Sequence, residues 1–277
     1  MYTALSKDKR IKDIYIVGNF LSYGKRFVNL SNVNFQRDIV PIAESVAEAV
    51  GTQGASDFYH FFETTIPKIQ TILGAESDWD VAASHAEANV RVLVAMNGQQ
   101  LKKLAYDPSA LVREHVAKQI QHKRSSLNCF ELDYLLDKLA CDSDAKVRAA
   151  VAACGKKNIL DLLVGDASDY VRQAVARSGA QEHLDLLAKD SSVDVRGAVA
   201  TTGSCTKLLC GDESELVRIV IANCSNPRDI DDTSLLADES ENVRAVLASR
   251  GMYHEILATD SSKLVQEAVI EATNYAA

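Results

Sequence analysis

The amino-acid sequence predicts an all-α fold, a solenoid of about eight short helical repeats that follows an N-terminal helical region. One pattern carries this prediction: an Asp, a Val-Arg pair ending six residues later, and then a Val-Ala pair. Its clearest copies begin at Asp142, Asp166 and Asp190, which are 24 residues apart. Repetition at a period of about 20–50 residues is the signature of a solenoid, in which each unit buries its apolar face against the next.

Each copy contains the signals of one good helix and a stunted partner. A serine lies two residues after most of the aspartates, as Ser168 and Ser192 do, and suits the N-cap of the main helix. A glycine such as Gly179 ends that helix after about ten residues. Only eight residues separate Gly203 from Asp212, which leaves room for a turn or two of helix, partly 3₁₀. We expect a leucine three residues before each aspartate to face the core.

The aspartate and arginine rows are offset by one copy. The first copy has His85 in place of the aspartate, and the last has Gln266 in place of the arginine. If each arginine pairs with the aspartate of the following copy, all seven of each are used, whereas pairing within a copy would leave two unpaired. We therefore predict an inter-repeat ladder of charge-assisted hydrogen bonds that sets the register of the copies. The expected pairs are Arg91 with Asp107, Arg113 with Asp142, Arg148 with Asp166, Arg172 with Asp190, Arg196 with Asp212, Arg218 with Asp238, and Arg244 with Asp260.

This pattern resembles the HEAT-like repeat superfamily, and its short period is most similar to the leucine-rich repeat variant type. The resemblance covers about residues 80–277 and implies a right-handed α-α superhelix. Some proteins of that type carry a cysteine-ligated iron–sulfur cluster in a separate N-terminal segment. This chain has no cysteine before Cys129, so that cluster is not expected here.

The N-terminal region, residues 1–80, is expected to be mainly helical and separate from the solenoid at 81–277. A helix over about 8–22 fits the apolar spacing, and a short strand and turn at Ile14–Val17 remains the alternative. Further helices are predicted over 38–50 and 56–73. Residues 1–37 carry seven basic and two acidic side chains, whereas the whole chain has a net charge of −8. This basic segment either docks on the acidic body, forms a solvated face or binds nucleic acid.

No motif of an enzyme is present, so we predict no catalytic residue, cofactor or metal ion. There is no phosphate-binding glycine loop, no His-Glu-x-x-His and no nucleophile elbow. None of the six cysteines forms a Cys-x-x-Cys pair, which is typical of reduced thiols in a cytoplasmic protein. Apolar runs are too short to span a membrane. HEAT-like di-iron hydroxylases repeat His-Glu dipeptides, and this chain has that order only at His254-Glu255.

The best functional interpretation is a non-enzymatic protein–protein interaction module, a scaffold, adaptor or inhibitor, whose partner is another protein; the acidic edge of the repeats would suit a basic one. The alternative is a nucleic-acid-binding or DNA-repair protein related to HEAT-like DNA glycosylases. The acidic edge of the repeats argues against phosphate binding and is either a surface for a basic partner or only solvated. The residues predicted to bind the partner differ between copies and lie in the short second elements and an insertion near Gln119–Phe130. They are Arg124, Lys156, Lys157, His183 and Lys207.

Overall fold

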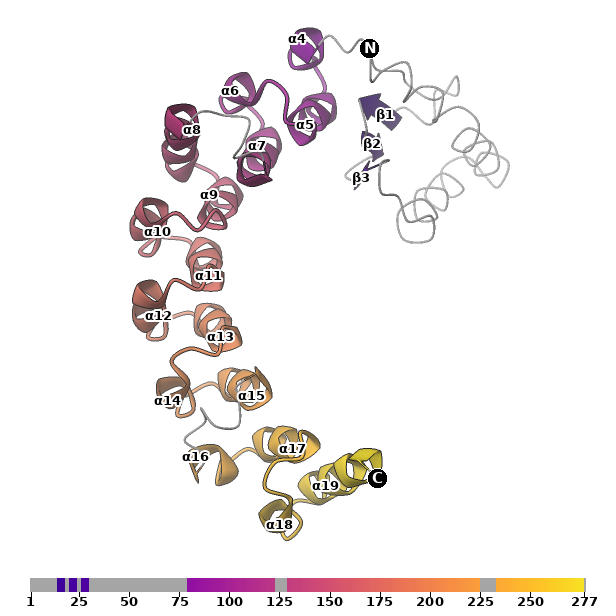
Figure 1. The fold of residues 1–277 in the computed structure, drawn as a ribbon, viewed down its shortest axis with the longest axis vertical. Helices are drawn as coiled ribbons and strands as arrows, with labels where there is room; N and C mark the ends of the chain where they lie inside the picture. Colours follow the sequence, from indigo (N-terminus) through magenta and orange to yellow (C-terminus); the bar gives the residue numbers. More distant parts are fainter. Residues whose placement is uncertain are drawn as a thin grey trace, which may run out of the picture. The chain divides into compact units, whose positions relative to one another are not determined.

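The computed structural model describes residues 14–17, 20–23, 26–29, 79–122, 129–224 and 233–276. The chain divides into two compact units, Met1–Val147 and Arg148–Ala277. From residue 79 onward, every helix or strand in the described ranges is a helix (Figure 1). The predicted all-α solenoid is therefore confirmed for this part of the chain. The helices predicted over 38–50 and 56–73 lie outside the described residues, and the boundary near residue 80 stays a prediction.

The first unit begins with a small antiparallel sheet in the order β1-β2-β3, in which Ile14 pairs with Tyr23 and Phe20 pairs with Asn29. The alternative of a strand at Ile14–Val17 is confirmed, and a helix running through 8–22 is wrong. The strands are β1 (Ile14–Val17), β2 (Phe20–Tyr23) and β3 (Arg26–Asn29). The helices are α4 (Trp79–Ala82), α5 (Ala88–Met96), α6 (Leu101–Leu104), α7 (Ala110–His122) and α8 (Cys129–Ala140), and α9 (Ala145–Ala152) crosses the division between the units.

Strands β1 and β2 lie against α5, the main helix of the first copy. Val90 and Val92 are fully buried although they are not on one helical face, and so are Leu93, Val94 and Ala95. A helix with buried apolar residues on several sides must be covered on each of those sides. The sheet and α7 both pack on α5, so the sheet covers the side of the first copy that has no preceding repeat.

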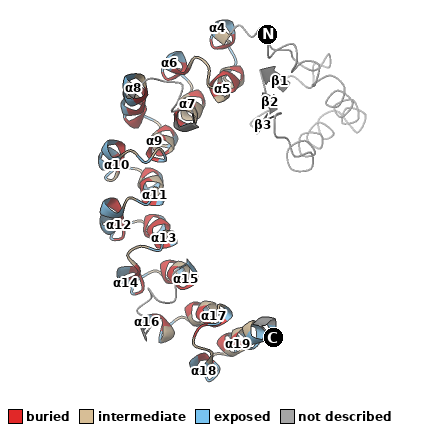
Figure 2. Ribbon diagram, viewed as in Figure 1, coloured by how far each residue is buried: buried red, intermediate tan, exposed pale blue. Residues whose placement is uncertain are grey.

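In the second unit, successive main helices pack against one another, and shorter second elements lie on one side of them (Figure 1). Valines four residues apart, such as Val171 and Val175, are fully buried between copies. In Figure 2 the outer sides of most second elements are pale blue, that is, exposed. The main helices are α11 (Asp169–Arg177), α13 (Val193–Thr201), α15 (Glu215–Cys224), α17 (Glu241–Ser249) and α19 (Lys263–Ala276). The second elements are α10 (Lys157–Leu163), α12 (Gln181–Leu187), α14 (Thr206–Leu209), α16 (Thr233–Leu236) and α18 (His254–Leu257).

In the copies of 22 and 24 residues, the length of the second element follows the length of the copy. Where 24 residues separate the ladder aspartate of one copy from that of the next, the second helix has seven residues, as in α10 and α12. Copies with 22 have helices of four residues, α6, α14 and α18, which are α-helical rather than 3₁₀. Each of these three helices starts after a residue in the left-handed region: Gln100 before α6, Cys205 before α14 and Tyr253 before α18. This sharper turn accommodates the two missing residues.

All seven expected Arg–Asp pairs are present, and each joins one copy to the next. The arginine Nε donates to Asp Oδ2 at 2.6–2.7 Å, and Nη2 donates to Oδ1 at 2.8–3.0 Å. Such bidentate pairs fix both distance and orientation. The side chains are 3–16% exposed. The ladder is therefore a set of largely desolvated links.

The third guanidinium nitrogen, Nη1, makes a bond within the copy that explains how His85 and Gln266 replace the aspartate and the arginine at the two ends of the ladder. Arg172 Nη1 donates to the backbone oxygen of Asp166, the aspartate of its own copy, at 2.8 Å. In the first copy the same bond needs only a backbone carbonyl, and His85 supplies it to Arg91. In the last copy Gln266 Nε2 donates to the backbone oxygen of Asp260 and so keeps the link within the copy.

Ser168 and Ser192 are the N-cap residues of α11 and α13, as predicted, but the predicted capping bond is wrong for both, because their side chains make none. The aspartates act two residues earlier instead: Asp166 Oδ1 accepts from the backbone N–H of Ser168 at 2.8 Å. Ser240 has both contacts, since its Oγ also accepts from the backbone N–H of Asn242, and so does Asp144 at the equivalent position, whose Oδ1 accepts from the backbone N–H of Lys146. The carboxylate that binds the preceding arginine thus also closes the turn into its own main helix.

Removing one partner of a ladder pair should destabilise the fold far more than removing both. We expect Arg172→Ala to lower the free energy of unfolding by about 3 kcal/mol, because Asp190 would keep a desolvated, unpaired charge. The double variant Arg172→Met, Asp190→Leu should lie within about 1 kcal/mol of the wild type. Urea unfolding of the three proteins measures this. Equal losses in the single and double variants would contradict it.

Stability should fall in acid through the same pairs. Hydrogen bonds from Arg148, Arg172 and Arg244 hold the pKa values of Asp166, Asp190 and Asp260 below their ordinary value. A lowered pKa in the folded state stabilises the fold above the pKa of the unfolded chain, about 3.9, and this contribution is lost as pH falls through the lowered pKa. Urea midpoints should therefore drop below about pH 4. The double variant at 172 and 190 should show a smaller drop.

Candidate partner-binding surface

Of the five residues predicted to bind a partner, two lie exposed on the second elements of the second unit. Lys157 is in the first turn of α10, and Lys207 is in α14. Lys156 is the half-buried residue before α10, and Arg124 lies outside the described residues. The prediction is wrong for His183, which is only 4% exposed, because its ring turns inward from α12. The structure therefore brings Lys157 and Lys207 to one face, on different second elements, and leaves His183 beneath that face.

Lys157, Asp161, Glu182 and His183 form a compact ionic cluster between α10 and α12. Lys157 Nζ lies 3.0 Å from Asp161 and 2.9 Å from Glu182. His183 Nε2 lies 2.8 Å from Asp161 Oδ1. The hydrogen bonds from His183 and Lys157 lower the pKa of the Asp161 carboxyl. The carboxylates and the imidazole also lie close enough to one another to be ligands of a metal ion.

The imidazole of His183 argues against a metal ion in this cluster. Its Nδ1 is buried and has no hydrogen-bond partner. This favours the tautomer in which Nε2 carries the proton and donates it to Asp161. A metal on Nε2 would move the proton to Nδ1, where no acceptor lies, whereas histidine ligands almost always donate their second N–H. The cluster is better suited to hold α10 and α12 together.

The next copy repeats this contact with different chemistry. Asp185 in α12 is equivalent to Asp161, and Cys205 is equivalent to His183. Cys205 Sγ donates to Asp185 Oδ1 at 3.4 Å, and Gln181 Nε2 donates to the same oxygen at 3.1 Å. Burial, followed by the bond to Asp185, raises the pKa of the Cys205 thiol to about 11. This cysteine is therefore poorly suited to act as a nucleophile.

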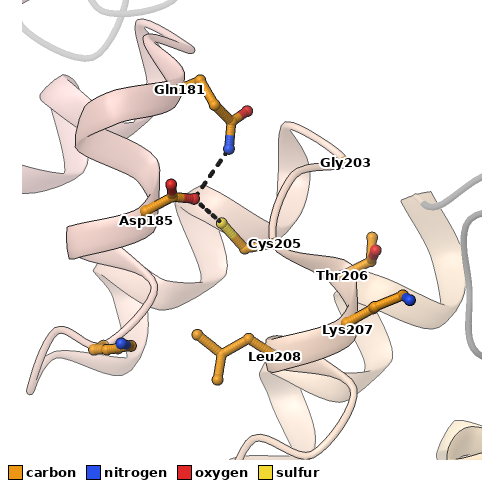
Figure 3. A pocket seen from close by; sticks show the side chains of 8 residues that line it. Gln181, Asp185, Gly203, Cys205, Thr206, Lys207 and Leu208 are labelled. Atoms are coloured by element: carbon orange, nitrogen blue, oxygen red, sulfur yellow. Dashed lines mark hydrogen bonds between the residues drawn. The ribbon is translucent and has the colours of Figure 1, made fainter.

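An open hollow of about 700 Å³ lies beside this contact, between α12 and α14 (Figure 3). It exists because α14 is shorter than α12: Gly203 stands where α12 has Gln181, so no helical turn faces the first turn of α12. The walls combine the carboxylate of Asp185, the side chain of Leu208 and the lysines Lys189 and Lys207. The hollow can thus receive a side chain that is partly apolar and partly charged.

The sequence interpretation missed a row of exposed leucines on the same face. Leu162, Leu186 and Leu208 are 55%, 59% and 48% exposed, at equivalent positions of α10, α12 and α14. The signal was present: each directly precedes the buried core leucine, and two adjacent residues of a short helix cannot both face inward. Ile256 continues the row in α18 with 56% exposure, after Ser234 in α16.

A separate aromatic cluster lies in the first unit. Tyr106, Phe130 and Tyr134 are 55%, 84% and 60% exposed and line a hollow of about 290 Å³. The two tyrosine hydroxyls are hydrogen-bonded to each other, and the ammonium of Lys138 lies 4.5 Å from the centre of the Tyr106 ring. Glu131 at the same hollow is paired with a lysine. The lining of the hollow thus holds one cation and one carboxylate, with the Lys138 ammonium beside it.

This architecture defines a HEAT-like helical-repeat solenoid. The solved structure of a leucine-rich repeat variant with a novel repetitive structural motif is similar to it, with 21% identity, a TM-score of 0.54, and 73% of this chain and 85% of that chain covered. At this identity the likeness shows the fold alone. An Escherichia coli protein, YibA, matches with 17% identity, 69% and 98% coverage and a TM-score of 0.43, too weak to bear on the fold.

No protein-family model matches the chain, and a search of curated proteins found no relative. Among the described residues, no helix is both long and apolar enough to cross a membrane.

The Cys205 thiol should react slowly in the folded protein. At pH 8 its alkylation by iodoacetamide should be about a hundredfold slower than in the urea-unfolded chain, because so little thiolate is present. Mass spectrometry of the Cys205 peptide over time measures both rates. Asp185→Asn, which removes the second cause of the raised pKa, should speed the folded-state reaction. A folded-state rate as fast as the unfolded one would contradict the raised pKa.

Proposed function

We propose that the chain is a non-enzymatic protein-interaction module, a scaffold, adaptor or inhibitor, that binds a partner protein on the second elements of residues 148–277. The observation that carries this proposal is the row of exposed leucines at equivalent positions of α10, α12 and α14. Single exposed apolar residues are ordinary on protein surfaces. An apolar side chain that recurs at one position in three successive copies forms a continuous strip.

The dimensions and surroundings of the strip support this function. Packed helices lie about 8–10 Å apart, so Leu162, Leu186 and Leu208 extend over about 16–20 Å. Charged groups of both signs border the strip: Asp161 in α10, Asp185 in α12 and Lys207 in α14. Apolar anchors with a polar rim are the usual anatomy of a protein interface. The hollow beside Leu208 adds a recess for one side chain.

The ladder weighs against the nucleic-acid alternative. The arginines that recur in every copy, such as Arg196 and Arg218, are 7% and 8% exposed and already pair with carboxylates. Phosphate binding needs cations that can release counterions at the surface, and these arginines lack that freedom. A partner protein uses apolar anchors instead, which the strip supplies.

Replacing the three leucines by glutamine should remove the partner and leave the fold intact. Glutamine keeps helix propensity, and exposed sites change stability by only about 0.5 kcal/mol. We expect at least one protein in a nuclease-treated extract of the source cells to bind the wild type at least about tenfold more strongly than Leu162→Gln, Leu186→Gln, Leu208→Gln. Quantitative affinity purification with mass spectrometry measures this.

The matched control carries the same kind of change in α19, where Leu264 and Ile270 are 43% and 59% exposed. The variant Leu264→Gln, Ile270→Gln should retain the protein that the triple variant loses. If all three baits retain the same proteins in equal amounts, this face does not bind the partner.

A further inference from the structure

We propose that a second surface, the groove that runs along α13 between α11 and α15, binds a lysine- or arginine-rich segment of a protein and seats one aliphatic side chain of that segment over Gly197. This surface lies on the main helices, and the proposed function above uses the second elements. The inference therefore goes beyond that function and stands or fails separately.

Gly197 is the origin of the groove. Glycine disfavours the interior of a helix relative to alanine, and the equivalent positions of neighbouring copies hold Gln173 and Ile219. A Cβ atom built on Gly197 would meet no atom within 4 Å, and its backbone is not in the left-handed region. Packing within the chain therefore does not require a glycine here. Its effect is to leave the surface of α13 open.

The groove has the size of a receptor for a side chain. Its volume is about 240 Å³, below the range of about 300–1,000 Å³ that is usual for small-molecule pockets. It follows α13 from Val193 to Thr201, a rise of about 12 Å. Gly197 lies between these residues, and Leu216 of α15 forms one wall. Leu216 is 67% exposed, so its apolar surface is available to a ligand.

One end of the groove opens at a strongly acidic edge, where the main helices begin. Asp194 lines the groove itself, and Glu213 and Glu239 have side chains that are 85% and 89% exposed. Six acidic side chains gather along this edge, from Asp169 and Asp194 through Glu213, Glu215, Glu239 and Glu241.

The ladder does not neutralise this edge, because each ladder arginine is already matched by a ladder aspartate. Glu213 and Glu239 reach Arg196 and Arg218 only at 3.2 and 3.5 Å, as second carboxylates on one guanidinium. Glu215 accepts hydrogen bonds from the neutral Ser240 and Asn242, which bring no positive charge. The edge therefore carries an excess of negative charge that attracts a cationic partner.

The two features together define the occupant. An acidic edge alone would hold any polycation, and an apolar groove alone would hold any aliphatic side chain. Asp194 and Leu216 line the same groove, so a segment that carries cations beside an aliphatic residue satisfies both. Arg177 lines the groove as well and belongs to the last turn of α11, so the cations of the segment lie over the end of the groove where α13 begins.

Peptide binding to the full chain tests this assignment. The probe is acetyl-Lys-Arg-Lys-Leu-Lys-Arg-amide with a fluorophore, and the matched probe has glycine in place of leucine. By fluorescence anisotropy, the leucine probe should bind at least about fivefold more tightly than the glycine probe. Gly197→Leu fills the groove with a residue of higher helix propensity and should remove that difference. Glu213→Gln, Glu239→Gln should weaken both probes and reduce their salt dependence.

Two controls keep the test specific. Gly165→Leu makes the same change at an exposed glycine in the turn after α10 and should leave binding unchanged. The triple glutamine variant at Leu162, Leu186 and Leu208 should also bind the leucine probe normally, which separates this surface from the second elements.

Several results would overturn the proposal. Equal affinity of the leucine and glycine probes for the wild type would reduce the surface to nonspecific attraction. An unchanged preference in Gly197→Leu would place the leucine elsewhere. Self-association of the wild type in sedimentation velocity that Gly197→Leu abolishes would make a second copy of the chain the occupant.

Discussion

The structure depends on one side chain used in two directions. An arginine such as Arg172 binds the backbone of its own copy through Nη1 and the carboxylate of the next copy through Nε and Nη2. That carboxylate, on Asp190, also accepts the N–H of Ser192 and so closes the turn into the next main helix. Each link therefore sets the start of a helix and the register of its neighbour at once. Because buried ion pairs add little net stability, apolar stacking stabilises the fold and the ladder specifies which stacking is adopted.

The ladder could be predicted from the sequence because its chemistry recurs and its ends differ. Counting His85 and Gln266 as exceptions was enough to choose pairing between copies over pairing within them. The serine caps could not be predicted from the same pattern. Ser168 and Asp166 are both good partners for free N–H groups, and the sequence does not show that Asp166 already bonds the serine backbone. The two bonds use different N–H groups and occur together at Ser240, so whether a serine also caps its helix depends on the orientation of its own side chain.

The candidate surfaces were harder to predict, since they rest on residues that break the pattern. His183 looked variable and polar, yet its ring is buried against Asp161, where a pairwise contact replaces apolar packing. The exposed leucines each adjoin a core leucine, and the sequence pattern assigned a side only to the core leucine of each pair. The strand at Ile14–Val17 was one of two alternatives that the sequence left open, and its packing on α5 was indicated only by the buried run from Val92 to Ala95. In each case the missing information was which side of a short element faces a neighbour.

Stability and recognition thus fall on different positions of the same repeat. The valines, leucines, arginines and aspartates that recur cannot change without disturbing two copies. The side chain of Leu186 and the open space above Gly197 both face solvent, so substitutions there change the free energy of unfolding little. A solenoid can therefore acquire a new partner by altering single copies. Gly197 of α13 has that character, because it leaves a recess where the neighbouring copies have the side chains of Gln173 and Ile219, and α14 leaves another recess because it is shorter than the preceding α12.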